Sequence, residues 1–411
     1  MTRRGPSIRK VRDYATRSLG LEQYLRRPGD GRKRPQIRAT DLLWAQVSGQ
    51  ILQKTSFHDV ERLVRSGVAR ELALNRVFSE DSLAYFNARL DPQPTRAALV
   101  AAAKRAKRNK VFRGQARIGL AIDGTGAGRC RAKSKVCKYC RPFKDDEGNV
   151  VGHKHEIVMA SVVGVGLSLP VDVEPYEQGD CELAGGQRLL ARSTKALGSR
   201  FADYVVADAK FAAAPFLNDA VRLGLHAVVR LKDNVPSLFD RATVRFNSRA
   251  RDTVIDHHGE PVEIWDDETF EPWEGLEWKF VRVLRYRYRS PKGEVVDAYW
   301  LTDYSQQSIS SMSLFRLAKS RWEIENEGFN EAKTRHGMEH ICHHDANALL
   351  VGWLLLLLGL VIERLYRHCF LHRGSHPRIT AADLLLLLLL ALARPPTRAR
   401  PEPAPAAITS V

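Results

Sequence analysis

The sequence predicts an α/β fold with a β-rich insertion, flanked by helical N-terminal and C-terminal regions. Apolar runs of strand length alternate with amphipathic segments of helix length between about 114 and 232, which is the pattern of a layered α/β domain. Residues 233–303 are instead rich in Val, Trp, Tyr and Arg, with turn signals at His258-Gly259 and Pro291-Lys-Gly293. This composition is typical of antiparallel strands.

The 411 residues carry a formal net charge of +17 and are 44% hydrophobic. A chain of this length and composition buries a large core and is expected to form more than one domain. The positive charge is concentrated in blocks, such as those at 26–27, 32–34 and 104–110. Repeated basic blocks favour a polyanionic partner, and nucleic acid is the commonest one.

The chain begins with two regions of different pattern. Residues 1–37 are rich in Arg, Gly and Pro with little periodicity, and we expect a basic, flexible arm there. From 38 to 113, apolar residues recur at three- and four-residue spacing, which predicts several short helices. Short helices beside basic blocks are typical of a small DNA-binding domain, although a helical bundle that only packs on the next domain fits the same pattern.

The α/β domain is predicted in two parts, 114–232 and 304–394, separated by the insertion. A long helix from about 308 to 337 opens the second part, and further helices pack behind it. The last residues, 395–411, are rich in Pro and Ala and are predicted to be disordered. In the first part, strands are predicted at 117–123, 156–163, 166–173, 203–207 and 225–231, and helices at 181–197 and 212–223.

Two leucine-rich stretches, 348–362 and 384–393, are apolar enough to suggest membrane spans. Each is shorter than the roughly 20 residues needed to cross a bilayer, so we expect two buried helices and no membrane association. The six cysteines come with no pattern of a secretion signal at residue 1. That combination indicates a reducing compartment, and a cytoplasmic location is expected.

Two aspartates and a glutamate carry the chemistry. Asp123 and Asp208 each end an apolar run of strand type, and Glu325 follows on a basic amphipathic helix. Taken alone, each aspartate is more often a turn or helix-cap residue. Together, three carboxylates can hold two Mg²⁺ or Mn²⁺ ions, an arrangement that cleaves phosphodiester bonds.

Three stretches resemble bacterial insertion-sequence transposases of the DDE class. They are Asp123-Gly-Thr, Ala207-Asp-Ala-Lys-Phe-Ala-Ala-Ala-Pro-Phe and, after the β-rich insertion, Arg321-Trp-Glu-Ile-Glu-Asn-Glu-Gly-Phe-Asn-Glu-Ala-Lys. The resemblance spans about 115–365, and the stretch that begins at Arg321 is its most specific part. It implies a ribonuclease-H-like core in which Asp123, Asp208 and Glu325 form the catalytic, metal-binding triad.

The resemblance also implies a function. Such enzymes bind the terminal inverted repeats of a mobile element as double-stranded DNA, and they use Mg²⁺ or Mn²⁺ to cleave a strand and transfer it to a target. Two protomers, a homodimer on paired ends, are expected to act together. Two alternatives use the same residues: a metal-dependent nuclease that does not join strands, and a transposase-derived DNA-binding protein without catalysis.

The chain departs from the family pattern at two positions. Many relatives have a tyrosine three residues before the arginine, where this chain has Ala318, and a lysine seven residues after the glutamate, where it has Ala332. Lys333, one residue later, is the candidate DNA-phosphate-binding lysine. The offset leaves Glu323 and Glu327 as alternative third ligands.

Helical spacing favours Glu325 over these two neighbours. Arg321, Glu325 and Phe329 recur every four residues on one face, whereas Glu323 and Glu327 point about 200° away from Glu325. Arg321 is predicted to bind a DNA phosphate, with a salt bridge to Glu325 as the alternative.

A second metal site is suggested by Cys137 and Cys140, a C-x₂-C pair in a Lys-rich loop. Cys130 precedes the pair, and His153 and His155 follow it. Thiols and imidazoles at such spacing are typical ligands of structural zinc. A Zn²⁺ ion held by Cys137, Cys140, Cys130 and His153 is therefore one hypothesis, and reduced thiols on a mobile loop are the other.

Three further groups receive structural interpretations. Trp322 and Phe329 are expected to pack against the sheet, with stacking on a DNA base as the alternative. Asp180 and Glu182 are predicted to cap a helix and not to bind metal. A helix end or a DNA contact is expected for the cluster around Cys342, namely His340, His343 and His344.

Overall fold

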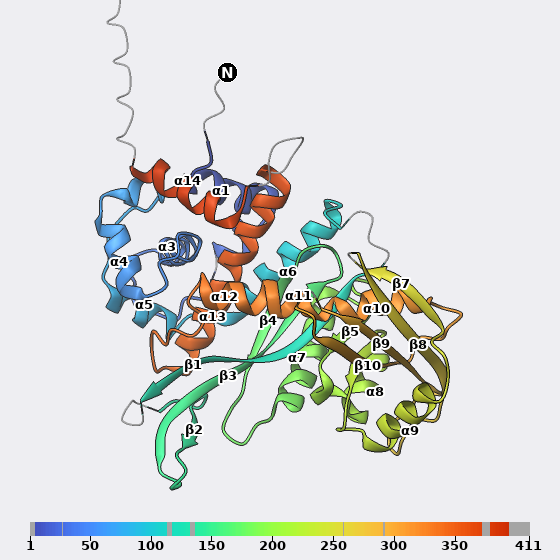
Figure 1. Cartoon of the computed structure of the whole chain (residues 1–411). Coiled ribbons are helices and arrows are strands. Elements are labelled where there is room, and N and C mark those ends of the chain that lie inside the picture. The colour runs from blue at the N-terminus through green and yellow to red at the C-terminus, as the bar shows by residue number, and fades with distance from the viewer. Residues whose placement is uncertain are drawn as a thin grey trace, which may run out of the picture.

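A ten-stranded sheet runs through the computed structural model of the chain, which describes residues 5–26, 28–112, 117–131, 136–257, 259–290, 292–371 and 379–393 (Figure 1). Neighbouring strands follow the order β2-β3-β1-β5-β6-β10-β9-β8-β7, and β4 also pairs with β3. The strands are β1 (Gly119–Arg131), β2 (Arg141–Lys144), β3 (Val150–Val163), β4 (Leu169–Pro175), β5 (Tyr204–Ala207), β6 (His226–Leu231), β7 (Thr253–His257), β8 (Glu260–Phe270), β9 (Val281–Arg289) and β10 (Val295–Thr302).

The strands β4, β3, β1, β5 and β6 form a ribonuclease-H-like core. β3 is antiparallel to both β1 and β4, whereas β5 runs parallel to β1 and to β6. All four residues of β5 are buried, and so are four of the six residues of β6, the exceptions being His226 and the half-buried Arg230. Helices cover the parallel part of the sheet. Two of these helices are α7 (Glu182–Leu197) and α8 (Ala214–Arg222). The predicted α/β class is confirmed.

The β-rich insertion continues the core sheet. From β7 to β10, each strand pairs antiparallel with the next one along the chain, and β10 also pairs with β6 of the core. The helix α9 (Pro236–Asn247) precedes these strands and was not predicted. Inside the insertion, the fully buried Arg282 binds the buried Asp266, and its Nη1 donates to the carbonyl oxygens of Ser305 and Ile309. This contact fixes the insertion to the segment that leads into the next helix.

The N-terminal helices pack around a long C-terminal helix, α13 (Figure 1). They are α1 (Ile8–Asp13), the π-helical turn η1 (Tyr14–Ser18), α2 (Glu22–Leu25), α3 (Ala39–Ile51), α4 (Phe57–Arg65), the 3₁₀ turn η2 (Val68–Arg70), α5 (Glu80–Asn87) and α6 (Pro92–Arg108).

Within the described part of the segment 1–37, the structure differs from the predicted flexible arm. Val11, Leu21 and Leu25 are buried in the core, and the Tyr14 hydroxyl donates to the Leu365 carbonyl oxygen at 3.2 Å. The periodicity was hidden because these apolar residues stand between many arginines and the helices are short. Packing on α13, and not local helix propensity, stabilises them.

The predicted long helix at 308–337 is divided into shorter segments. They are α10 (Ser311–Lys319), α11 (Arg321–Glu323), the π-helical segment η4 (Ile324–Phe329) and α12 (Asn330–Thr334). The wider π-helical turn carries Glu325. Such turns are frequent at functional sites.

α13 (Ala346–Leu365) and its π-helical continuation η5 (Tyr366–Leu371) form one apolar helix. By length and composition this helix could cross a membrane, but 94% of its most apolar window is buried inside the protein, which is the environment of a core helix. For α14 (Ala381–Ala393) the prediction of a buried helix is wrong on one face, because Leu386 and Leu390 are half exposed. The predicted disordered tail, 395–411, lies outside the described residues.

Candidate active site

Asp123 and Asp208 occupy equivalent positions on two adjacent parallel strands. Ile122 of β1 pairs with Ala207 of β5, and each is followed by its aspartate. The carboxylates of Asp123, Asp208 and Glu182 each offer an oxygen that lies within 4.8 Å of the others. The structure thus brings together two predicted ligands and adds a third carboxylate.

Glu182 was predicted to be a helix-capping residue, and the structure corrects this. It lies in the first turn of α7, whose N-cap is Cys181 and has no side-chain cap. The carboxylate points back over Gly124, where an added Cβ would lie 2.3 Å from Glu182 Oε1. Glu182 Oε2 accepts from Lys210 Nζ at 2.7 Å. Only a glycine after Asp123 permits this approach, and that is the one sequence signal that could have revealed it.

Asp180, the other predicted cap, accepts at Oδ1 from the Cys181 N–H at 3.0 Å and pairs with Arg188. It therefore holds the loop before α7 and stays outside the carboxylate cluster of the described residues.

Arg321 links Glu325 to the cluster. Its Nη1 donates to Asp123 Oδ2 at 3.0 Å and to Glu325 Oε1 at 2.6 Å. The Arg321 side chain is 10% exposed, whereas that of Glu325 is 36% exposed. The salt bridge considered as the alternative role of Arg321 is therefore present, and one guanidinium is shared by two predicted ligands.

Burial and mutual repulsion perturb the aspartates. The pKa of Asp123 is raised to about 7, mainly by burial and in part by the charges of Asp208 and Glu325, while the charge of Arg321 opposes the rise. Burial, together with the charge of Glu182, also raises the pKa of Asp208. The cluster holds more negative charge than its surroundings stabilise, and a bound cation would favour the ionised forms.

The other candidates on this helical segment point elsewhere. Glu323 accepts from the Gly164 N–H at 3.0 Å, and Glu327 accepts from the Ser168 N–H at 2.8 Å, so both are held against the loop between β3 and β4. Lys333 pairs with Glu339 at 3.1 Å. Glu325 is the one of the three glutamates whose carboxylate bonds to the arginine that contacts Asp123.

The two aromatic residues beside the site differ in environment. Phe329 is 6% exposed and packs in the core, as predicted. Trp322 is 39% exposed, and the Arg321 guanidinium lies 4.7 Å from its ring centroid. Its ring is therefore half open to solvent next to the carboxylate cluster.

The cysteine loop forms a separate cluster. Cys137 and Cys140 lie beside His155 of β3, and Cys130 of β1 lies near Cys140 and His344. The ligand predicted from spacing, His153, is not in either group. His155 is two residues further along the same strand, and its buried imidazole has a pKa lowered to about 4.

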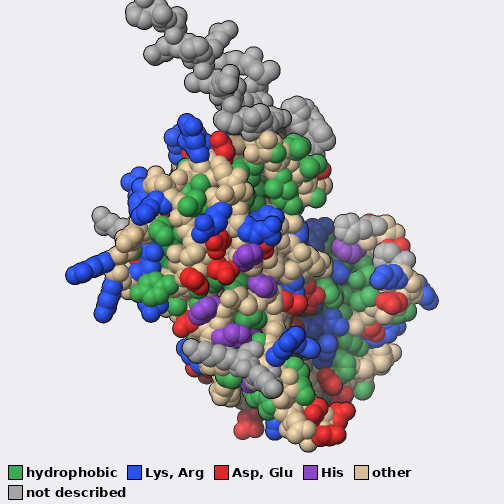
Figure 2. Space-filling view, turned by 90° about the vertical axis from the view of Figure 1, so that its left-hand side faces the viewer, with side chains coloured by type: hydrophobic (Ala, Val, Ile, Leu, Met, Phe, Trp, Pro, Cys, Tyr) green, Lys and Arg blue, Asp and Glu red, His purple; other side chains and the backbone are tan. Residues whose placement is uncertain are grey.

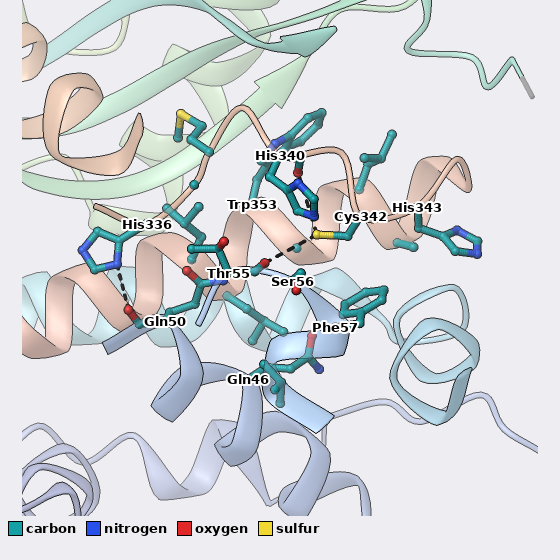
Figure 3. Close-up of a pocket in the computed structure, with 18 residues that line it drawn as sticks. Gln46, Gln50, Thr55, Ser56, Phe57, His336, His340, Cys342, His343 and Trp353 are labelled. Atoms are coloured by element: carbon teal, nitrogen blue, oxygen red, sulfur yellow. Dashed lines mark hydrogen bonds between the residues drawn. The ribbon is translucent and has the colours of Figure 1, made fainter. Parts of the chain in front are cut away.

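The remaining histidines line a different hollow, shown in Figure 3. His336, His340, Cys342 and His343 border a pocket between the N-terminal helices and α13. The Cys342 thiol lies 3.6 Å from the Thr55 carbonyl oxygen. Among the described residues, Cys342, His340 and His343 belong to no group that could hold a metal, whereas His344 of the same predicted cluster lies with Cys130 and Cys140.

Figure 2 shows Lys and Arg side chains spread over the N-terminal helices and within the recess beside the sheet. Acidic groups are interspersed, yet the chain as a whole is strongly basic, at +17.

Known proteins were compared with the chain in three ways. A solved structure, a cryo-EM structure of the piggyBac transposase synaptic complex with hairpin DNA, is similar at 12% identity and a TM-score of 0.44, over 94% of this chain and 77% of that chain. No curated protein sequence matches. The family model described as "Transposase DDE domain" matches residues 114–362, more than half of the chain. The chain therefore belongs to the DDE transposase domain family.

Proposed function

We propose that this protein is an active DNA transposase that binds terminal inverted repeats and catalyses metal-dependent strand cleavage and strand transfer. One observation carries the proposal: Asp123 and Asp208 directly follow paired residues of two adjacent parallel strands, and Arg321 joins Asp123 to Glu325. These are the three acids that the family resemblance assigns to catalysis. A relic that no longer cuts would have no need to retain all three around one site.

The carboxylate cluster fits divalent cations. The carboxylates of Asp123, Asp208 and Glu182 offer hard oxygens within 4.8 Å of one another, and burial among them raises the pKa of Asp123. Asp123, Asp208 and Glu325 would hold Mg²⁺ or Mn²⁺, with Glu182 beside them. When bound, the ions supply charge stabilisation for the attacking and leaving oxygens of phosphodiester displacement.

The side chains of the chain itself position the DNA. Arg321 is able to exchange its carboxylate partners for a phosphate, because its guanidinium presents several donors in one plane. Lys210, bonded to Glu182 and 67% exposed, offers a second cation at the rim. Asp123 must lose its proton for the site to work, and the positive charges of Arg321 and Lys210 favour that loss.

The DNA is proposed to lie across the basic surface around the site. Lys and Arg contacts to phosphates give affinity without sequence preference, and base contacts by the N-terminal helices would select the repeats. Two copies of the chain on paired ends, in the cytoplasm, complete the proposal.

The test is cleavage and joining of a labelled transposon-end duplex by purified protein with Mg²⁺. Asp123→Asn, Asp208→Asn and Glu325→Gln are expected to lose cleavage by at least about 10³-fold, since each removes charge at the reacting phosphate, while DNA binding remains. Glu327→Gln is the matched control and should still cut.

Three outcomes would contradict parts of the proposal. Normal cutting by any of the three variants removes that residue from the triad. Cleavage without joining by the wild type indicates a nuclease. Binding without cleavage under all metal conditions indicates a DNA-binding relic.

A further inference from the structure

Outside the carboxylate cluster, thiols and imidazoles from three segments converge on Cys140. Cys137 and Cys140 come from the loop after β1, His155 from β3, and Cys130 from β1 itself. Cys140 and His155 are fully buried. We propose that Cys137, Cys140, His155 and Cys130 bind one structural Zn²⁺ ion; the proposal is independent of catalysis at the carboxylates.

The distances match those of a tetrahedral zinc site. Zinc–sulfur bonds of about 2.3 Å and zinc–nitrogen bonds of about 2.0 Å place two thiolates about 3.8 Å apart, and a thiolate and an imidazole nitrogen about 3.5 Å apart. In the structure, the sulfurs of Cys137 and Cys140 are 3.6 Å apart. His155 Nε2 lies 3.3 Å from Cys140 Sγ and 3.9 Å from Cys137 Sγ. Three donors already outline one face of the tetrahedron.

The fourth donor follows from the strand register. Cys130 pairs with His153 across β1 and β3, so its side chain lies on the same face of the sheet as those of His153 and His155. Its sulfur lies within 4.8 Å of Cys140 Sγ. His344, from the loop before α13, also lies within that distance of both sulfurs and is the competing candidate for the fourth donor.

The environment is that of a closed, structural site. The backbone N–H of Cys137 donates to Cys140 Sγ at 3.3 Å, the kind of contact that stabilises a thiolate. The rings of His155 and Tyr139 each lie 6.4 Å from Trp353 of α13, so apolar groups cover the cluster. Zinc here would fix the cysteine loop to the C-terminal end of β1 and to β3. Thiolate ligands would select zinc over the Mg²⁺ proposed for the carboxylates.

The experiment measures metal content in full-length protein purified under reducing conditions. We expect one zinc per chain, and we expect Co²⁺ substitution to give thiolate-to-cobalt absorption. Cys137→Ser and His155→Ala are expected to lose zinc. His153→Ala is the matched control, because it alters the neighbouring histidine of the same strand face, and it should retain zinc.

A second measurement uses the wild type alone, in case these variants fold poorly. Chelation at neutral pH should increase the number of thiols that react with a disulfide reagent by three per chain, because Cys130, Cys137 and Cys140 become free. Absence of zinc and of a cobalt spectrum in the wild type, or zinc retained in Cys137→Ser, would overturn the site. Zinc lost in His344→Ala but retained in Cys130→Ser would overturn Cys130 as the fourth ligand.

Discussion

At the scale of single residues, the carboxylate cluster contains one more acid than the family pattern supplies. Glu182 shares Asp123 and Asp208 as neighbours, and Lys210 neutralises it. We expect Glu182→Gln to raise the Mg²⁺ concentration for half-maximal cleavage by about 10–100-fold, as for other groups that support metal ligands. Saturating Mg²⁺ should restore most of the rate, because the amide keeps the volume of the side chain.

The control for this prediction is Glu177→Gln, which removes an exposed partner of Lys138 and should leave the Mg²⁺ dependence unchanged. A Glu182→Gln variant that is inactive at every Mg²⁺ concentration would instead make Glu182 a triad member.

Asp123 makes the stability of the metal-free protein depend on pH. Its pKa rises from 3.8 to about 7 on folding, so folding takes up a proton between these values, and the free energy of unfolding falls as pH rises through this window. At about 1.4 kcal/mol per unit of difference in pKa, the full effect is about 4 kcal/mol.

Thermal unfolding without metal at about pH 4, near the acid end of this window, and at about pH 8, beyond its alkaline end, tests the assignment. Asp123→Asn should remove this part of the loss and unfold at a higher temperature than the wild type at the alkaline end. A wild-type difference that persists unchanged in the variant would assign the effect to other groups, such as Glu323, whose pKa burial also raises to about 7.

Whether a residue of the candidate site can be predicted depends on whether the residues it contacts are close to it in sequence. Asp123 and Asp208 follow from apolar runs that end in a carboxylate, and Glu325 from helical spacing to Arg321. Glu182 joins the site only through the close approach over Gly124, which no spacing encodes. His155 replaces His153 near the cysteines for a similar reason, since the two lie on one strand face and only the tertiary position of the loop chooses between them.

At the scale of elements, the buried pair of Asp266 and Arg282 connects β8 and β9 to the segment before α10. Both side chains are at most 1% exposed, and the Ser311 hydroxyl also donates to Asp266. Asp266→Ala is expected to destabilise the protein by about 3–5 kcal/mol, because it leaves a buried guanidinium without its partner.

Denaturant unfolding measures this change. The control Glu277→Ala breaks an exposed ion pair with Arg222 and is expected to change stability very little. Equal changes in the free energy of unfolding would mean that the buried pair stabilises the protein no more than the exposed pair does.

Element type was predictable where one period dominates over several residues. α7 lies where it was predicted. β1 and β3 also include most or all of their predicted residues, but each is longer at one end, where the two strands pair outside the apolar run. The π-helical segment Ile324–Phe329 was not predictable, because its residues differ little from those of an α-helix. Its conformation accompanies the bonds of Glu323 and Glu327 to the β3–β4 loop, which are long-range contacts.

At the scale of the whole molecule, the first helices belong to the core. Arg105 Nε donates to the Ser18 carbonyl oxygen at 2.9 Å, and Arg12 Nη1 donates to that of Leu72 at 3.0 Å. Removing residues 1–26 should therefore destabilise the protein by more than about 5 kcal/mol, since each buried apolar side chain contributes about 1.5–3 kcal/mol.

Solubility and the unfolding temperature of the truncated protein check this expectation, beside a control that lacks only residues 1–4. A truncated protein that unfolds like the full chain would restore the view of these residues as a separate arm.

The bond of Arg321 to Asp123 and Glu325 has a thermodynamic consequence for the whole reaction. A divalent ion that binds the two carboxylates competes with an internal cation, so its apparent affinity is reduced by the free energy of separating the guanidinium. Once separated, that guanidinium is available to a phosphate, and the phosphate in turn lowers the cost of separation. Metal and DNA should then bind with positive cooperativity, each raising the affinity of the other by the same factor. Without either ligand, the guanidinium would offset part of the negative charge of the site, and the reactive arrangement would form only when both ligands arrive.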